Sequence, residues 1–316
     1  MTHRVFIDGQ AGTTGLELAS RLERHDRIEA LSIEEQERKD PGRRRERFAE
    51  ADVVVLCLPD DAAKEAVELL PGARFLDAST AHRVARDWVY GLPELAAGQR
   101  QAIREADRVA NPGCYPTGVI LSVRPLVDAG LVDPGTALHV HAVSGYSGGG
   151  KSLIAKYAGN DSPAWRHRSY SLDLNHKHLP EMRAYAGTVR PPLFVPSVGD
   201  YHSGMLVHVG LTGRELEGGA TPVDVHRVLA DRYTGEPFVH VHNYHPDAVL
   251  EDGFLSPTAR NGTNHLDLMV FGNDEQVLIA SRFDNLGKGA AGAAVQNLNL
   301  MLGLPETRGL VAEVTA

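Results

Sequence analysis

The segment "NPGCYPTG", residues 111–118, contains one of only two cysteines in a chain of 316 residues. An apolar periodic run begins just after Cys114, and Pro116 suits the first turn of a helix. We therefore expect a helix over residues 115–130, with Cys114 at or just before its N-terminus. Unpaired amides and the helix dipole stabilise a thiolate there and would also hold an oxyanion at a carbon bonded to the sulfur. The position predicts a nucleophilic cysteine, and the alternative is a cysteine that only caps the helix.

The second cysteine, Cys57, lies in "VVVLCLP", which has the pattern of a buried strand. A buried thiol behaves as a small apolar group with a raised pKa. We therefore interpret Cys57 as structural.

A thiolate nucleophile needs an acid/base partner, and the segment "LNHKHLPEM" contains two histidines that flank Lys177. His176 and His178 stand directly before the helix-like run "LPEMRAYA". A helix N-terminus lowers the pKa of an imidazole and keeps it available as a base. No further ligands at zinc-binding spacing accompany the pair, so we expect no metal site.

A glycine turn follows the first strand-like run and opens the first helix-like run. Glycines permit a tight turn and a close approach of the backbone to a pyrophosphate, and the free amides of the helix favour an anion. The residues are Gly9, Gly12 and Gly15, with the hydroxyls of Thr13 and Thr14 beside them. We expect a dinucleotide here, and the alternative is a purely structural turn.

The end of the second strand selects between the two nicotinamide cofactors. A carboxylate there binds the ribose 2′-hydroxyl of NAD, whereas a small polar residue with nearby cations accommodates the 2′-phosphate of NADP. Ser32, Arg38 and Lys39 favour NADP(H), while Glu34 and Glu35 favour NAD. We predict NADP(H).

Strand-like and helix-like runs alternate over the first hundred residues, which predicts a parallel sheet covered by helices. The expected strands cover 4–9, 27–33, 51–59, 73–79 and 107–113, and the expected helices cover 13–25 and 60–70, the latter with Asp60 as N-cap. After Cys114 long β-type runs predominate, interrupted by a helix at 221–233, which predicts a mainly antiparallel sheet. A helix rich in small residues, 286–303, is expected to return to the first domain.

The bulk composition restricts the class of protein. A net charge of −9 argues against a protein that coats nucleic acid, and the basic cluster at 38–47 is interpreted as a solvated face. No apolar run is long enough to cross a membrane, and the N-terminus does not resemble a secretory signal. Two cysteines outside any CxxC pair suit a reducing compartment, so we expect a cytoplasmic protein.

Taken together, these motifs resemble the N-acetyl-γ-glutamyl-phosphate reductase family in its shorter form. The resemblance spans nearly the whole chain, through "DGQAGTTG", "YGLPEL", "NPGCYPTG", "VSGYSGGGK", "NHKHLPE", "VPSVGDYHSGMLV", "GTNHLDL" and "DNLGKGAAGAAVQNLNLMLG". Two loops depart from the common pattern of the family. "DASTAHR" stands where most members resemble L-S-A-D-F-R, and "SGYSGGG" replaces a G-A-G-type loop.

The resemblance implies an α/β protein with two domains, like aspartate-semialdehyde dehydrogenase and the glyceraldehyde-phosphate enzymes. A Rossmann-type NADP-binding domain would cover residues 1–113, completed by the C-terminal helix within 285–316. An α+β domain with a mainly antiparallel sheet, residues 114–284, would carry catalysis and the contacts of a homo-dimer or homo-tetramer.

The resemblance also assigns roles to residues. It gives His176 the acid/base role beside Cys114 and makes His178 a substrate-orienting neighbour, although the reverse order stays open. Ser144 and Gly145 are expected to approach the cofactor or the reacting centre. Arg83 and Lys151 are candidate binders of substrate anions, with solvated surface positions as the alternative.

The implied reaction is the NADPH-dependent reduction of N-acetyl-γ-glutamyl phosphate in arginine biosynthesis, through a thioester on Cys114. Rival enzymes are aspartate-semialdehyde dehydrogenase and reductases of other acyl phosphates, including carrier-linked or longer-chain analogues. A rival of another class is a nucleotide-sensing regulator that kept the fold and uses the arginines at 43–45 to bind nucleic acid. The presence of both Cys114 and His176 argues against the regulator.

Overall fold

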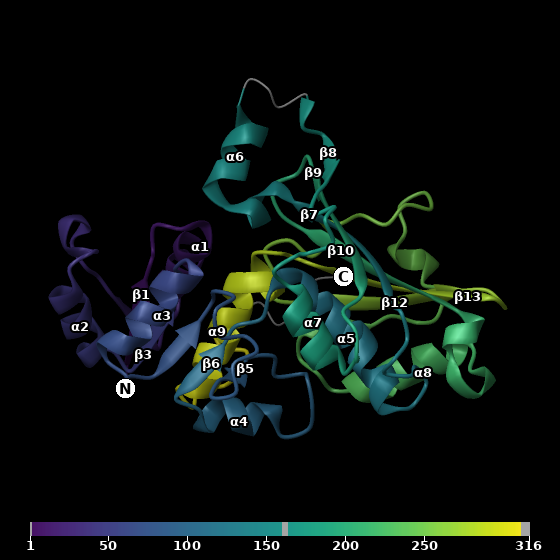
Figure 1. The fold of residues 1–316 in the computed structure, drawn as a ribbon, viewed down its shortest axis with the longest axis horizontal. Coiled ribbons are helices and arrows are strands. Elements are labelled where there is room, and N and C mark those ends of the chain that lie inside the picture. The colour runs from purple at the N-terminus through teal and green to yellow at the C-terminus, as the bar shows by residue number, and fades with distance from the viewer. Residues whose placement is uncertain (1, 160–163, 311–316) are drawn as a thin grey trace. The chain divides into compact units, whose positions relative to one another are not determined.

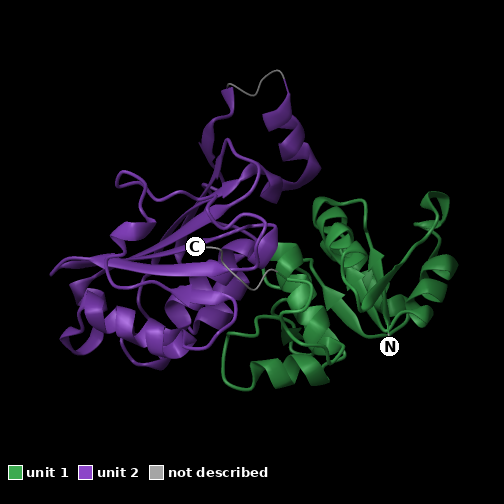
Figure 2. Ribbon diagram, turned by 180° about the vertical axis from the view of Figure 1, so that it is seen from behind, with its two compact units in different colours: residues 1–113, 290–316 green, residues 114–289 purple. Residues whose placement is uncertain are grey.

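The chain divides into two compact units, each built on one β-sheet. The computed structural model describes residues 2–159 and 164–310. Unit 1 consists of Met1–Gly113 with Ala290–Ala316, and unit 2 consists of Cys114–Gly289 (Figure 2).

The sheet of unit 1 is parallel throughout its described strands, which confirms the prediction. Its strand order is β2-β1-β3-β4-β6-β5. The strands are β1 (His3–Asp8), β2 (Ile28–Leu31), β3 (Val53–Leu56), β4 (Phe75–Asp77), β5 (Val89–Tyr90) and β6 (Arg108–Ala110). Because β1 pairs with β2 on one side and β3 on the other, the order reverses beside β1, and ligands bind at such a switch point in open parallel sheets.

Helices cover this sheet (Figure 1). They are α1 (Thr13–Glu23), α2 (Pro41–Glu50), α3 (Asp60–Leu69), α4 (Gln99–Glu105) and α9 (Gly292–Met301), with a short 3₁₀ turn at Glu35–Glu37. Phe48 is the buried residue of α2, and its ring packs against Phe6 and Phe75 at centroid distances of 5.9 Å. Every residue of α9 is buried, and α9 contacts α1 and α4.

The sheet of unit 2 is mixed and mainly antiparallel, as predicted. Its strand order is β11-β12-β13-β10-β7-β9-β8, and only the β7–β9 and β11–β12 pairs among the described strands are parallel. The strands are β7 (His139–Gly145), β8 (His167–Ser169), β9 (Leu193–Gly199), β10 (Met205–Thr212), β11 (Val239–Val241), β12 (Leu266–Gly272) and β13 (Gln276–Phe283).

Helices α5 (Cys114–Asp128), α7 (Leu179–Ala186) and α8 (Pro222–Tyr233) belong to this unit (Figure 1). Helix α5 packs on β10 and β13, and α8 packs on β11 and β12. Nearly all of α5 is buried, so the position of its first residue is tied to the core of the unit. A further helix, α6 (Gly150–Ala158), follows a glycine-rich stretch and has no counterpart among the sequence-based predictions.

Candidate active site

Cys114 is the first residue of α5, where the sequence predicted it. Its side chain is partly exposed, whereas Tyr115 and the following residues of the first turn are buried. The first amides of a helix have no acceptor within the helix, and their dipoles favour negative charge. A sulfur at this position is therefore held where a thiolate is stabilised.

The two predicted histidines lie around the ring of Tyr115, the residue that follows the cysteine. The centroid of the Tyr115 ring is 5.9 Å from that of His176 and 6.0 Å from that of His178. Phe194 of β9 closes the group, at 5.3 Å from His176 and 5.1 Å from Tyr115. His178 is buried and His176 is half-buried. The start of α5 and the segment before α7 thus form one cluster within unit 2.

The backbone assigns the tautomer of His176. The amide of His178 donates a hydrogen bond to Nδ1 of His176 at 3.1 Å, so Nδ1 is the unprotonated nitrogen and the neutral ring carries its proton on Nε2. This nitrogen faces the hydroxyl of Tyr170 at 3.5 Å. His176 therefore presents a donor, rather than an acceptor, at its outer nitrogen.

Two tyrosines continue this chain of polar groups. Tyr170 donates to the hydroxyl of Tyr115 at 3.3 Å, and Tyr115 donates to the carbonyl of Ser197 at 3.3 Å. The hydrogen bonds then run in one direction. Nε2–H of His176 points to the hydroxyl of Tyr170, Tyr170 donates to Tyr115, and Tyr115 donates to the backbone of β9. The sequence analysis assigned no role to these tyrosines. Tyr115 adjoins the cysteine, but no local signal connects Tyr170 to the site, since their contact depends on the tertiary fold.

Burial sets the charge state of the cluster. Desolvation lowers the pKa of His176 to about 4, and the charge of Lys177 adds to the effect. Desolvation also raises the pKa of Tyr115 and of Tyr170 well above that of free tyrosine. At neutral pH the cluster holds a neutral imidazole and two neutral phenols. The predicted lowering is confirmed for His176, but its cause is burial with a neighbouring lysine rather than the N-terminus of α7.

The glycine turn of unit 1 has the features of an anion site. Gly9 has φ +89°, and a Cβ there would lie 2.4 Å from the carbonyl oxygen of Cys57. Gly12 occupies the N-cap of α1 without a side-chain cap, which leaves the first amides of the helix available. The buried Oγ1 of Thr13 has no hydrogen-bond partner among the described residues. The turn therefore offers amides and a buried hydroxyl to a ligand at the switch point beside β1.

The other predicted cofactor residues lie in both units. Ser32 is exposed directly after β2, and the nearby Arg38 forms an exposed ion pair with Glu35 at 3.8 Å. Ser144 and Gly145 end β7 in unit 2, where the amide of Gly145 donates to the carbonyl of Gly204 at 2.9 Å. These positions are compatible with the predicted roles, which stay predictions.

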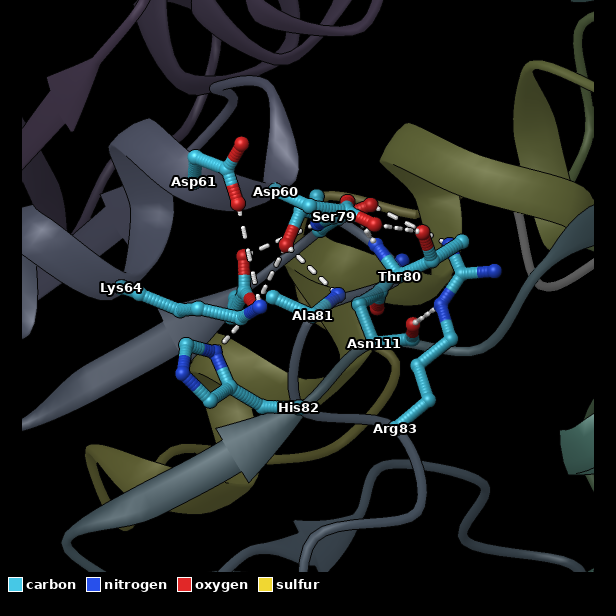
Figure 3. A network of polar contacts seen from close by, with 11 residues as sticks. Asp60, Asp61, Lys64, Ser79, Thr80, Ala81, His82, Arg83 and Asn111 are labelled. Carbon is cyan, nitrogen blue, oxygen red and sulfur yellow. Dashed lines mark hydrogen bonds and ion pairs between the residues drawn. The ribbon is translucent and has the colours of Figure 1, made fainter. Parts of the chain in front are cut away.

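The loop "DASTAHR" after β4 is held by a polar network within unit 1 (Figure 3). The buried carboxylate of Asp77 accepts hydrogen bonds from the amide and hydroxyl of Ser79 and from Nδ1 of His82, the last at 2.7 Å. Asp60 accepts bonds from the amide and hydroxyl of Thr80. The predicted capping role of Asp60 is wrong, because Pro59 occupies the N-cap of α3 and Asp60 is its first helical residue.

The two candidate anion binders differ in exposure. Arg83 is buried, with Nε donating to the carbonyl of Asn111 at 3.0 Å and a terminal nitrogen donating to that of Ala78 at 3.1 Å (Figure 3). The solvated alternative is therefore wrong for Arg83. Lys151 is exposed on α6. Binding of substrate by either residue stays a prediction.

Cys57 lies just beyond the end of β3 and is half-buried. Desolvation raises the pKa of its thiol to about 12, and the carboxylates of Asp77 and Asp8 add to the shift. The raised pKa agrees with the structural interpretation, although the residue follows the strand instead of lying within it.

Comparison with known proteins identifies the family. An N-acetyl-γ-glutamyl-phosphate reductase 2 of a Nostoc species is 49% identical over 97% of this chain and 99% of its own length. The N-acetyl-γ-glutamyl-phosphate reductase of Brucella ovis is 49% identical over 96% of this chain and all of its own. The chain belongs to the N-acetyl-γ-glutamyl-phosphate reductase family. Two domain families also match, "Semialdehyde dehydrogenase, NAD binding domain" over residues 32–106 and "Semialdehyde dehydrogenase, dimerisation domain" over residues 114–285.

Solved structures connect this reductase family to a wider group by fold. Aspartate semialdehyde dehydrogenase II of Vibrio cholerae aligns with a TM-score of 0.68 over 96% of this chain and 99% of its own, at 15% identity. The Candida albicans enzyme, solved with NADP, gives a TM-score of 0.63 at 15% identity, covering 96% of this chain and 99% of its own. At this identity the likeness establishes the α/β fold alone.

Within the described ranges, no helix is both long and apolar enough to cross a membrane.

Proposed function

We propose that this protein reduces N-acetyl-γ-glutamyl phosphate with NADPH to N-acetylglutamate 5-semialdehyde and phosphate. The observation that carries the proposal is the position of Cys114 at the start of α5, beside the Tyr115–His176–His178 cluster. Relatives at 49% identity carry the name of this reductase, which supplies the substrate. The reaction would serve arginine biosynthesis in the cytoplasm.

Cys114 is the nucleophile in this proposal. Its thiolate attacks the acyl carbon, the carbon–sulfur bond forms, and phosphate leaves with the electron pair of the carbon–oxygen bond. Phosphate is a good leaving group, so the protein needs only to position the acyl phosphate and stabilise charge on the carbonyl oxygen. The first amides of α5 are the proposed donors to that oxygen, together with Nε2–H of His176, which would exchange its 3.5 Å contact with the Tyr170 hydroxyl for the substrate.

When bound, NADPH supplies the hydride that reduces the thioester carbon. The alkoxide produced on Cys114 then expels the thiolate and leaves an aldehyde. This collapse needs no proton on the oxygen, so a hydrogen bond from a neutral imidazole is sufficient. The low pKa of His176, about 4, and its protonated Nε2 suit a donor better than a base. His178 positions the ring of His176 through its backbone amide, and its side chain is proposed to orient the substrate.

Unit 1 is the proposed cofactor-binding domain, and unit 2 the proposed catalytic and subunit-contact domain. The glycine turn fits a pyrophosphate, because Gly9 admits no side chain and Thr13 offers an unpaired hydroxyl within the described chain. Ser32, with no carboxylate of its own, supports NADP over NAD. The match to a dimerisation domain supports a homo-dimer or homo-tetramer.

Replacing Thr13 with valine tests the cofactor site. Loss of one hydrogen bond to the ligand is expected to weaken NADPH binding by up to about 10-fold. Titration of the NADPH fluorescence measures this directly. Ser20→Ala, an exposed position on the same helix, is the matched control and should bind NADPH as the parent does. If Thr13→Val bound NADPH as tightly as the parent does, Thr13 would not belong to the cofactor site.

Side-by-side assays test the substrate. The reverse reaction, phosphate-dependent reduction of NADP, is expected with N-acetylglutamate 5-semialdehyde and at a far lower kcat/KM with aspartate semialdehyde. The parallel assay with NAD measures the cofactor preference. Turnover with aspartate semialdehyde alone would contradict the proposal and favour the enzyme class to which the chain is related only by fold.

A further inference from the structure

The chain between β13 and α9 makes a π-helical turn at Gly287–Ala291. The amide of Gly289 donates to the carbonyl of Asp284, five residues earlier, at 3.0 Å. The helix predicted over 286–303 is present, but its first turn is π-helical and the α-helical part, α9, begins only at Gly292. Single π turns are rare and occur frequently at functional sites.

Contacts on three sides fix the register of the first three residues of this turn, 287–289, which belong to unit 2. The carboxylate of Asp284 accepts bonds from the amides of Gly262 and Leu286, at 2.8 and 2.9 Å. A Cβ at Gly287 would lie 2.1 Å from the carbonyl oxygen of Thr263. Lys288 is fully buried, with Nζ 5.9 Å from the centre of the Phe238 ring. A shift by one residue would put a side chain against Thr263 and remove Lys288 from its place.

This register turns Gly289 toward the nucleophile. A Cβ at Gly289 would lie 2.9 Å from Cβ of Cys114 and 3.4 Å from its Cα. These atoms belong to the start of a buried helix and cannot swing aside as the end of a flexible side chain could. A side chain at position 289 therefore requires the first residue of α5 to move.

We propose that Gly289 is a positioning residue for catalysis. The π turn packs against the side chain of Cys114, and the absence of a side chain at position 289 determines where the sulfur lies. The Asp284 carboxylate and the buried Lys288 hold the π turn in register. The kinetic consequence rests on the proposed role of Cys114 as nucleophile.

The substitution Gly289→Ala tests the positioning role of Gly289. Displacement of a reacting group by an ångström costs about 10²-fold in rate, so kcat should fall by about that factor. The NADPH dissociation constant should not change, because the glycine turn belongs to the other unit. Gly72→Ala is the matched control, since a Cβ there meets open space and its φ is not left-handed. It should keep the parental kcat.

Two further measurements need no substrate. The alkylation rate of Cys114 by iodoacetamide, followed on its peptide by mass spectrometry, should change several-fold in Gly289→Ala and stay constant in Gly72→Ala. The fall in Tm caused by Gly289→Ala should be smaller in a Cys114→Gly background. The Cβ contact at 2.9 Å is absent there, and only the contacts of 3.3 Å to the carbonyl oxygen of Asp284 and 3.4 Å to Cα of Cys114 remain. This cycle separates a clash with Cys114 from strain elsewhere in the turn.

The proposal is overturned if Gly289→Ala keeps the parental kcat and alkylation rate. It is also overturned if its loss of Tm is the same with and without the Cβ of Cys114. A wrong substrate assignment would instead appear in the two semialdehyde assays and leave the alkylation rates and the Tm cycle as expected.

Discussion

Cys114→Ser is expected to abolish reduction of the acyl phosphate while leaving NADPH binding intact. A serine hydroxyl in place of the thiol stays protonated at neutral pH, and the first turn of α5 cannot offset so high a pKa. The loss of kcat should be about 10⁴-fold or more, as is usual when a covalent nucleophile is removed. Single-turnover measurement of phosphate release checks it, because thioester formation itself is lost.

The control for this variant is Cys57→Ser, which changes the other thiol of the chain. Burial raises the pKa of Cys57 to about 12, so its thiol is not ionised at neutral pH. Its replacement should leave most of the turnover. A Cys114→Ser protein that kept the parental turnover would contradict the proposed nucleophile, and the mechanism would have to be abandoned. A parental protein that bound NADPH but showed no turnover would instead favour the nucleotide-binding regulator.

Substitutions at His176 separate a donor from a base. His176→Asn removes the outer nitrogen and should lower kcat by about 10²–10³-fold, the usual cost of one oxyanion donor. His176→Gln places an amide N–H near the position of Nε2 and should recover a measurable part of that loss. If Nε2 served as the base, glutamine would restore nothing, because an amide accepts no proton.

The pH profile gives the same distinction. The pKa of His176 is lowered to about 4, so the ring is neutral above that pH and charged below it. The parental kcat should therefore show no titration of His176 between pH 5 and 8. A change is expected only as the pH approaches 4, where protonation of Nδ1 breaks its hydrogen bond with the amide of His178. An apparent pKa between 6 and 7 that disappears in His176→Gln would contradict a neutral donor.

Elements with a strong local pattern were predictable from the sequence. Strand β1, the glycine turn and α1 follow one another as expected, and Cys114 begins α5 as its periodicity and Pro116 indicated. The expectation of a parallel sheet in unit 1 came from the alternation of strand and helix patterns. These features depend on residues close together in the sequence, where propensity and periodicity act.

Elements without such a pattern were missed. Helix α6 begins at Gly150, directly after a run of glycines that indicates a loop. Strand β8 has only three residues, all exposed, and so shows no alternation of buried and exposed side chains. The parallel pairing of β7 with β9 joins strands separated by α6, β8 and α7, and no local signal encodes it.

The polar details of the site were beyond sequence reasoning for a related reason. The tautomer of His176 depends on one backbone amide, that of His178, and on the hydroxyl of Tyr170. Their directions are set by the tertiary fold. The burial of Arg83 likewise depends on carbonyls at Ala78 and Asn111, which the sequence does not place.

The discontinuity of unit 1 has a consequence for biosynthesis on the ribosome. Helix α9 is buried throughout, and its Asn297 donates to the carbonyl of Gly91 and to the side chain of Asn111, at 2.8 and 3.0 Å. A nascent chain that ends before residue 290 lacks this helix, although residues 1–113 emerged first. Unit 1 therefore cannot complete its core until the whole of unit 2 has been translated.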